Sequence, residues 1–316
     1  MTRQIDRLEE QRTWAGLHSK VKHGVMAAKE NMTVVDGRAY SETGRDISHL
    51  VDVVVKTTEK QARGLEVVDD LTALEKENGG FVFAFFKQSR TIEERFPSLT
   101  QQDVARLMYI GTFVAWKTGR LQSENGKAII NREKLEQLVE MSSKRFNELF
   151  RRYEAEDILR ENVETGEIFV NPSVFFRGNM KDSGVDVSDL QYTRMFRQTV
   201  RDLYAKFKGR TLGQLALIYS VMPFINFNTN IVCYNPEETI EEMLRPMPLE
   251  KLAMVLEYAN PGKLKRALNA VKVDDKPVFT YVTNAHDRRK QNIIVNPRVI
   301  YAGDGKGLGA ITALFN

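Results

Sequence analysis

The sequence is poor in cysteine and histidine and has no long apolar segment. Its one cysteine, Cys233, excludes a disulfide framework and a thiolate metal site and is typical of a protein of the reducing cytoplasm. The four histidines are scattered, so we expect no bound metal. No apolar run approaches the ~18 residues that a membrane-spanning helix needs, and the charged N-terminus MTRQIDRLEEQRTW has no signal-peptide core. We therefore expect a cytoplasmic protein with no membrane partner.

Recognisable catalytic motifs are also missing. No phosphate-binding GxxxxGK[ST] is present, and we interpret GDGKGLG (303–309) as a flexible turn before a final short helix. The run His286-Asp287-Arg288-Arg289 could belong to a tyrosine recombinase with Tyr301 as nucleophile, but only 11 residues separate Arg289 from Tyr301. In that chemistry the tyrosine lies much further downstream. A DNA strand-transfer enzyme is therefore a minor hypothesis, and we expect neither an enzyme nor a cofactor.

The positive charge of the chain is concentrated at its C-terminal end. The 316 residues, 42% hydrophobic and 28% charged, are enough for two domains with apolar cores, and they carry a net charge of +4. Between Asn260 and Asn316, ten Lys/Arg stand against four Asp and no Glu, a net charge of +6. This segment is the electropositive part of the protein and the first place to look for a nucleic-acid contact.

Two stretches 125 residues apart share one pattern: FVNPSVFFRG (169–178) and IVNPRVIYAG (294–303). Asn-Pro after a strand ends the ladder, because proline has no N–H to donate, and a final glycine permits a positive φ. We interpret the motif as a structural exit from a hairpin. Its main value is to align two repeats, roughly 81–178 and 203–303.

Each repeat predicts the same order of elements. In the first, a helix begins at the cap Thr100, helices cover 130–141 and Ser143–Tyr153, and two strands surround ENVETGE (161–167). In the second, MPLEKLAMVLEY and ANPGKLKRALNAVK take the places of the paired helices, and strands surround NAHDRRKQN (284–292). A helix, a helix–turn–helix and a two-stranded wing form the winged-helix layout.

The predicted fold is mainly α with small β-wings: tandem winged-helix domains plus an N-terminal accessory region. Within the accessory region, the first 30 residues predict a helix, and TVVDGRAY predicts a hairpin. The predicted segments are the accessory region 1–80, the first winged-helix domain 81–180, a linker and start of a connecting helix 181–202, and the second winged-helix domain 203–316.

The second helix of each helix–turn–helix carries the residues that we expect to contact DNA. Arginine, lysine and asparagine are the residue types that bind guanine, adenine and phosphate. The candidate DNA-binding residues are Ser143, Lys144, Arg145, Asn147, Arg151 and Arg152 in the first copy and Lys263, Lys265, Arg266 and Asn269 in the second, with Arg288, Arg289 and Lys290 in the second wing. The first wing is acidic, so we expect the first domain to use its helix alone or to contact a protein.

The stretch from RLMYIGTFVAW through NREKLEQLVEMSSKRFNELFRRYEAEDILRENVETGEIFVNPSVFFRG is similar to the core of the winged-helix replication and regulatory proteins of Firmicute plasmids and phages. The second repeat resembles it in layout and in IVNPRVIYAG. The resemblance implies sequence-specific binding of double-stranded DNA by a replication initiator or transcription regulator, without catalysis. The alternative is a phage protein-interaction module that docks on host replication or transcription proteins. A homo-oligomer fits either hypothesis.

Overall fold

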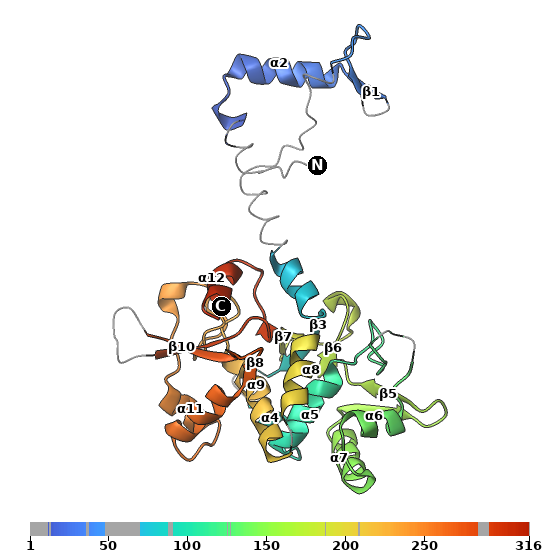
Figure 1. Cartoon of the computed structure of the whole chain (residues 1–316), viewed down its shortest axis with the longest axis vertical. Coiled ribbons are helices and arrows are strands. Elements are labelled where there is room, and N and C mark those ends of the chain that lie inside the picture. Colours follow the sequence, from blue (N-terminus) through green and yellow to red (C-terminus); the bar gives the residue numbers. More distant parts are fainter. Residues whose placement is uncertain are drawn as a thin grey trace. The chain divides into compact units, whose positions relative to one another are not determined.

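The computed structural model of the chain describes residues 12, 14–35, 38–47, 70–87, 91–124, 126, 128–186, 188–207, 209–283 and 291–315. The chain divides into two compact units, Met1–Asp69 and Asp70–Asn316, here called unit 1 and unit 2. Both predicted repeats lie in unit 2. Figure 1 shows the elements of each unit along the chain.

Unit 1 contains a helix and a hairpin. The helix α2 (Ser19–Glu30) falls within the predicted N-terminal helix and begins after His18, whose ring nitrogen Nδ1 accepts a hydrogen bond from the Lys20 N–H. Strands β1 (Thr33–Val35) and β2 (Arg38–Tyr40) pair in antiparallel register. The hairpin predicted from TVVDGRAY is therefore confirmed.

The centre of unit 2 is a four-stranded antiparallel sheet in the order β12-β7-β3-β6. Strands β3 (Phe81–Phe86) and β7 (Gln191–Phe196) form its central pair. Each of them also pairs with the short strand that ends its own repeat, β3 with β6 (Phe175–Phe176) and β7 with β12 (Ile300–Tyr301). Because an antiparallel pair has a local two-fold axis between its strands, this order relates the two repeats by an approximate two-fold axis.

The remaining elements of the first repeat follow β3. They are α4 (Ile92–Arg95), α5 (Gln101–Gly111), α6 (Arg132–Leu138), α7 (Ser143–Ala155), β4 (Leu159–Asn162) and β5 (Glu167–Val170), and then the 3-10 turn η1 (Met180–Asp182) after β6. Thr100 begins α5 by accepting a hydrogen bond from the Asp103 N–H, and Asn131 begins α6 by accepting one from the Lys134 N–H. The helices therefore start where short polar side chains cap them.

The second repeat also places two paired helices and a hairpin between its two strands of the central sheet, and it has further elements that the first repeat lacks. Its elements are α8 (Arg197–Lys206), η2 (Gly209–Leu215), α9 (Ala216–Val221), η3 (Met222–Phe224), η4 (Glu241–Met243), α10 (Leu249–Val255), α11 (Pro261–Ala270), β8 (Lys272–Val273), β9 (Lys276–Pro277), β10 (Phe279–Thr283), β11 (Gln291–Val295) and, after β12, α12 (Leu308–Ala313). Asn260 caps α11 through the Lys263 N–H, and Pro261 stands at the first helical position, where its missing N–H is not needed.

One apolar core runs through both repeats. Buried Met108 and Phe150 of the first repeat belong to the same cluster as Ile218 and Leu264 of the second. The Tyr219 hydroxyl of α9 also donates a hydrogen bond of 2.6 Å to the Phe85 carbonyl of β3. The shared core fixes the two repeats relative to each other.

The prediction of a mainly α-helical protein is wrong. The described residues are mixed α/β, 43% helical and 20% strand, and they form four two-stranded sheets beside the four-stranded one. The central sheet could not be predicted from the sequence for two reasons. Strand β3 is buried along almost its whole length and therefore lacks the apolar–polar alternation of a half-exposed strand, and β7 lies in the segment interpreted as a linker.

The twin Asn-Pro motifs connect each hairpin to the central sheet. The Asn171 side chain donates a hydrogen bond of 2.9 Å to the Asp157 carbonyl, and the Asn296 side chain donates one of 3.2 Å to the Pro277 carbonyl. In each copy the side-chain oxygen accepts the backbone N–H two residues later. Each asparagine therefore holds the backbone before its hairpin and the backbone just after the proline of its own motif. These contacts support a structural role for the motif.

The glycine that ends each motif is needed for a different reason in each copy. Gly178 has a φ of +152°, in the range that favours glycine. Gly303 has no such φ, but a Cβ there would lie 2.8 Å from the Phe227 carbonyl oxygen and 2.4 Å from the Tyr301 hydroxyl. The expected positive φ is therefore present at Gly178 only, and Gly303 permits a close approach of the chain.

Gly303→Ala is expected to lower the free energy of unfolding of unit 2 by about 1–2 kcal/mol, because the added methyl group overpacks a buried site. The control is Gly309→Ala in α12, where a Cβ meets nothing within 4 Å. That substitution should instead raise the free energy of unfolding by about 0.5–1 kcal/mol. Urea denaturation measures both, and a Gly303→Ala protein as stable as the parent would contradict the close approach.

Candidate nucleic-acid interface

Each repeat contains two helices joined by a tight turn: α6 and α7 in the first, α10 and α11 in the second. The first helix of each pair ends in the same way. Glu140 has a φ of 52° and Glu257 has a φ of 55°, so a left-handed residue stands second after the end of α6 and of α10. The two helix–turn–helix elements therefore begin their turns alike.

Helix α7 is amphipathic. It buries one face formed by Phe146, Leu149, Phe150 and Tyr153. Its opposite face exposes three of the predicted residues, Lys144, Arg145 and Arg151. Within the described residues no hydrogen bond or ion pair holds these three side chains, so they are available to a ligand.

The other predicted residues of α7 have partners within the protein. Ser143 donates a hydrogen bond of 2.5 Å to a glutamate of α6, and Asn147 accepts one of 3.0 Å from Arg132. Arg152 forms an ion pair of 3.1 Å with Asp103, whose side chain is only 4% exposed. Arg152 therefore joins α7 to α5 and is not free to meet a ligand.

The first hairpin is less acidic than its sequence ENVETGE indicates. Glu161 lies 3.0 Å from Arg132, and Glu167 lies 2.7 Å from Arg120. The hydrogen bond from Arg120 lowers the pKa of Glu167 below its ordinary value. Of the three carboxylates, Glu164 at the tip remains exposed without an ion pair among the described residues. Repulsion between this hairpin and phosphate is thus weaker than the sequence predicts.

Arg132 is a site residue that the sequence analysis missed. It contacts the Glu161 carboxylate of the hairpin and the Asn147 side chain of α7, and its guanidinium lies 4.2 Å from the centre of the Phe150 ring. It therefore positions both α7 and the hairpin. Its main partner lies 29 residues away in the sequence, and no spacing rule connects the two.

Helix α11 presents a similar face. Lys263, Arg266 and Asn269 are exposed, and the opposite side of the helix is buried. The Lys265 ammonium instead lies 4.9 Å from the centre of the Tyr281 ring in β10. Lys265 thus joins helix and hairpin, as Arg132 does in the first repeat.

The tip of the second hairpin lies outside the described residues. Strands β10 and β11 pair as far as Thr283 and Gln291. Arg288, Arg289 and Lys290 stand between them in the sequence, and their role in binding stays a prediction.

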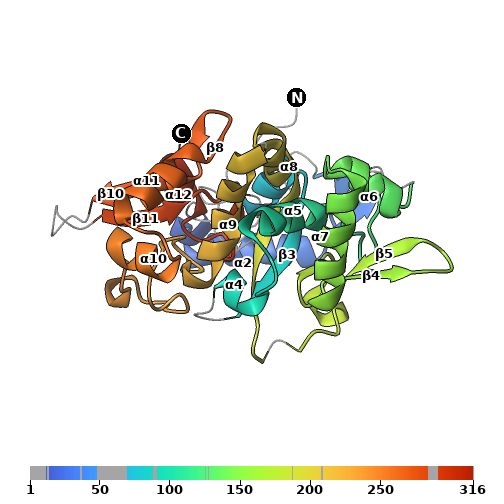
Figure 2. The ribbon, with the colours of Figure 1, turned by 90° about the horizontal axis from the view of Figure 1, so that it is seen from below.

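Helices α7 and α11 lie on the same side of unit 2. In Figure 1 both are at the lower edge of this unit, α11 on the left and α7 on the right. Seen from below, they flank α5 and α9 (Figure 2). One face of a single chain therefore offers two helices with exposed cations.

The candidate nucleophile Tyr301 is buried in the central sheet. Its hydroxyl accepts a hydrogen bond of 3.3 Å from the Gly305 N–H, and burial raises its pKa above the ordinary value. A recombinase nucleophile must reach a phosphate, so this position argues against strand transfer. His286, the histidine of the recombinase hypothesis, lies outside the described residues.

The described residues contain no group of three or more His, Cys, Asp or Glu side chains that could hold a metal ion. They also include no helix with the length and apolar character needed to cross a membrane. No protein-family model, curated protein or solved structure matches the chain. The function has to be inferred from the chain's own residues.

Proposed function

We propose that unit 2 binds double-stranded DNA through α7 and α11 and acts as a replication initiator or transcription regulator of plasmid or phage type. The observation that carries the proposal is a pair of helices at corresponding places in the two repeats, each with exposed cations and both at the lower edge of unit 2 in Figure 1. The second helix of a helix–turn–helix has the width and the exposed face that fit a major groove. Such a DNA partner agrees with the cytoplasmic location that we propose.

Because both repeats share one core, we expect a single chain to contact two half-sites of the DNA. Proteins with a single helix–turn–helix commonly dimerise to reach two successive major grooves. Here the approximate two-fold axis at β3 and β7 gives one chain two reading helices. Because α7 exposes Lys144, Arg145 and Arg151 whereas α11 exposes Lys263, Arg266 and Asn269, the two half-sites are expected to differ in sequence.

Selection of bound duplexes from a random DNA pool tests this proposal. We expect enrichment of two unlike half-sites whose centres are about 10 base pairs apart, one helical turn. The logarithm of the binding constant should fall linearly with the logarithm of the salt concentration, with a slope of about −0.9 for each phosphate contact. Enrichment of a perfect palindrome would favour a homodimer instead, and no enrichment at low salt would refute duplex binding.

A second candidate function, docking on a host replication or transcription protein, is favoured by one surface loop. Between Cys233 and Pro246, which form an isolated β-bridge, the chain exposes Ile240 and Met243 (55% and 62%) beside Glu241 and Glu242. The Asn235 side chain fixes this loop through the Met243 carbonyl and the Arg245 N–H. Exposed apolar side chains on a rigid acidic loop are typical of a contact with a basic protein surface.

The two candidate functions are separated by affinity capture from nuclease-treated extract. Docking predicts that one replication or transcription protein is retained stoichiometrically without DNA and is lost from the Ile240→Ser, Met243→Ser double variant. Retention that depends entirely on intact DNA would leave duplex binding as the function.

A further inference from the structure

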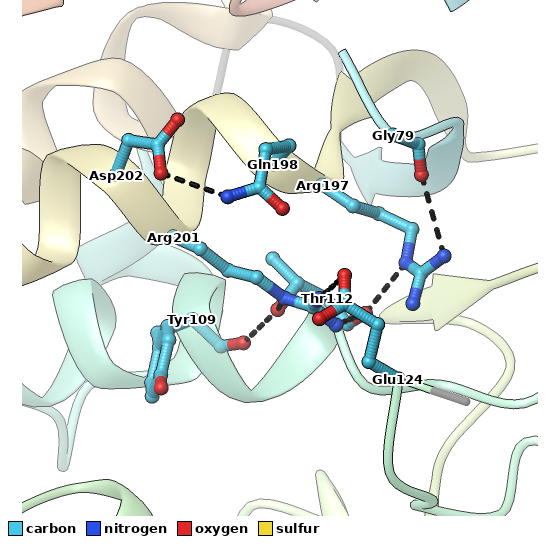
Figure 3. A network of polar contacts seen from close by, with 8 residues as sticks. All are labelled: Gly79, Tyr109, Thr112, Glu124, Arg197, Gln198, Arg201 and Asp202. Atoms are coloured by element: carbon cyan, nitrogen blue, oxygen red, sulfur yellow. Dashed lines mark hydrogen bonds and ion pairs between the residues drawn. The ribbon is translucent and has the colours of Figure 1, made fainter. Parts of the chain in front are cut away.

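Three arginines outside the candidate DNA interface gather beside the C-terminal end of α5. The Thr112 carbonyl there accepts hydrogen bonds from Arg197 (2.7 Å) and Arg201 (2.9 Å), both on α8 (Figure 3). Arg201 also forms an ion pair of 2.6 Å with Glu124. The charge of Arg177, which follows β6, contributes to lowering the pKa of Arg197, and the charge of Arg201 contributes to lowering the pKa of Arg177. We call Arg177, Arg197 and Arg201 the arginine cluster.

The positive charge of the arginine cluster is not balanced within the described residues. Glu124 is the one carboxylate that forms an ion pair with it there, and the Glu124 side chain is 71% exposed whereas that of Arg201 is only 10% exposed. Burial, together with the charges of Arg177 and Arg201, lowers the pKa of Arg197 to about 10. Partly buried guanidinium groups that repel one another create a local preference for an anion.

Capping of α5 explains two of the three arginines. Cations at the last carbonyl groups of a helix are stabilising, and this accounts for Arg197 and Arg201. It does not account for Arg177, whose guanidinium makes no hydrogen bond or ion pair among the described residues. A half-buried guanidinium whose N–H groups have no acceptor among the described residues can donate to a ligand.

An exposed aromatic ring stands next to this unfilled arginine. The Arg177 guanidinium lies 5.8 Å from the centre of the Trp116 ring, and Trp116 is 57% exposed. Guanidinium groups bind phosphate through paired hydrogen bonds, and unstacked bases stack on exposed aromatic rings. The combination of a phosphate-binding group and a stacking surface is typical of contact with a nucleotide that is not base-paired.

We propose that Arg177 binds the phosphate of an unpaired nucleotide whose base stacks on Trp116, and that the positive charges of Arg197 and Arg201 favour the bound anion. The site does not depend on duplex binding by α7 and α11, because it shares no residue with that interface. The nucleotide is either free in solution or part of a single strand, and both present the same phosphate and base to the cluster.

Trp116 itself reports on the proposed site. The chain has two tryptophans, so Trp14→Phe in the full-length protein leaves Trp116 as the single fluorophore. We expect its emission to be quenched to saturation by ATP without magnesium, by a single-stranded oligothymidylate, or by both. Quenching by ATP, with or without quenching by the oligonucleotide, would show that a free nucleotide is sufficient for binding. Quenching by the oligonucleotide alone would show that the ligand is a single strand.

Substitutions then distinguish a binding site from a capping role. Arg177→Ala should weaken binding at least tenfold, and Glu124→Gln should strengthen it severalfold because the competing carboxylate is removed. Lys206→Ala, which removes an exposed cation at the other end of α8, should change affinity less than twofold. Absence of quenching with both ligands would overturn the proposal, and so would quenching that neither Arg177→Ala nor Glu124→Gln alters.

Discussion

Replacing Lys144, Arg145 and Arg151 of α7 together by alanine is expected to weaken duplex binding about 100-fold or more. The three side chains are exposed and have no partner in the described part of the chain. A base contact by arginine or lysine contributes about 1–3 kcal/mol, and each 1.4 kcal/mol corresponds to a factor of ten in affinity. Loss of all three contacts therefore costs at least about 3 kcal/mol. Fluorescence anisotropy with the selected duplex, at one fixed salt concentration, measures the change.

The corresponding triple substitution in α11, at Lys263, Arg266 and Asn269, should weaken binding to a similar extent. Repeating the selection with each variant should relax the sequence of one half-site and leave the other unchanged, because each helix reads its own groove. Lys206→Ala on α8 is the control for charge alone. If the α7 variant bound DNA like the parent, the first repeat would not be part of the interface.

The parts of this interface that could be predicted from the sequence are those that local rules determine. The apolar positions of α7 recur at helical spacing, and the caps Thr100, Asn131 and Asn260 accept hydrogen bonds from residues within their own first turns. The helix predicted over Ser143–Tyr153 lies within α7, and Pro261 begins α11 as expected. Short-range patterns place these helices and their exposed faces correctly.

The remaining features depend on contacts between residues far apart in the sequence. Arg152 has the residue type and helix position of a DNA contact, yet it turns to Asp103 on α5. Arg120 and Arg132 neutralise two carboxylates of the first hairpin from other elements. Strand β3 finds its partner β7 more than a hundred residues later. Periodicity and spacing carry no information about such pairings, so the central sheet and these ion pairs emerge only from the structure.

Asp103→Ala is expected to lower the free energy of unfolding of unit 2 by about 3–5 kcal/mol, the range found when one partner of a buried ion pair is removed. Asp103 is 2% exposed, and its carboxylate lies 3.1 Å from Arg152 and 3.8 Å from Arg106. The same carboxylate accepts a hydrogen bond of 3.0 Å from the Thr100 N–H at the start of α5. The substitution thus removes a helix cap and leaves two arginines without their partner. Urea denaturation monitored by circular dichroism measures the loss.

Asp103→Asn separates the two contributions. Asparagine keeps an acceptor for the Thr100 N–H but removes the negative charge, so its loss of stability should be smaller than that of Asp103→Ala by about 1 kcal/mol, the worth of a typical cap. Since Arg152 is held by Asp103 and does not face the ligand, Arg152→Ala should lower stability without reducing the DNA affinity of the folded protein. An Arg152→Ala variant with parental stability and tenfold weaker DNA binding would instead return Arg152 to the interface, as its position on α7 first suggests.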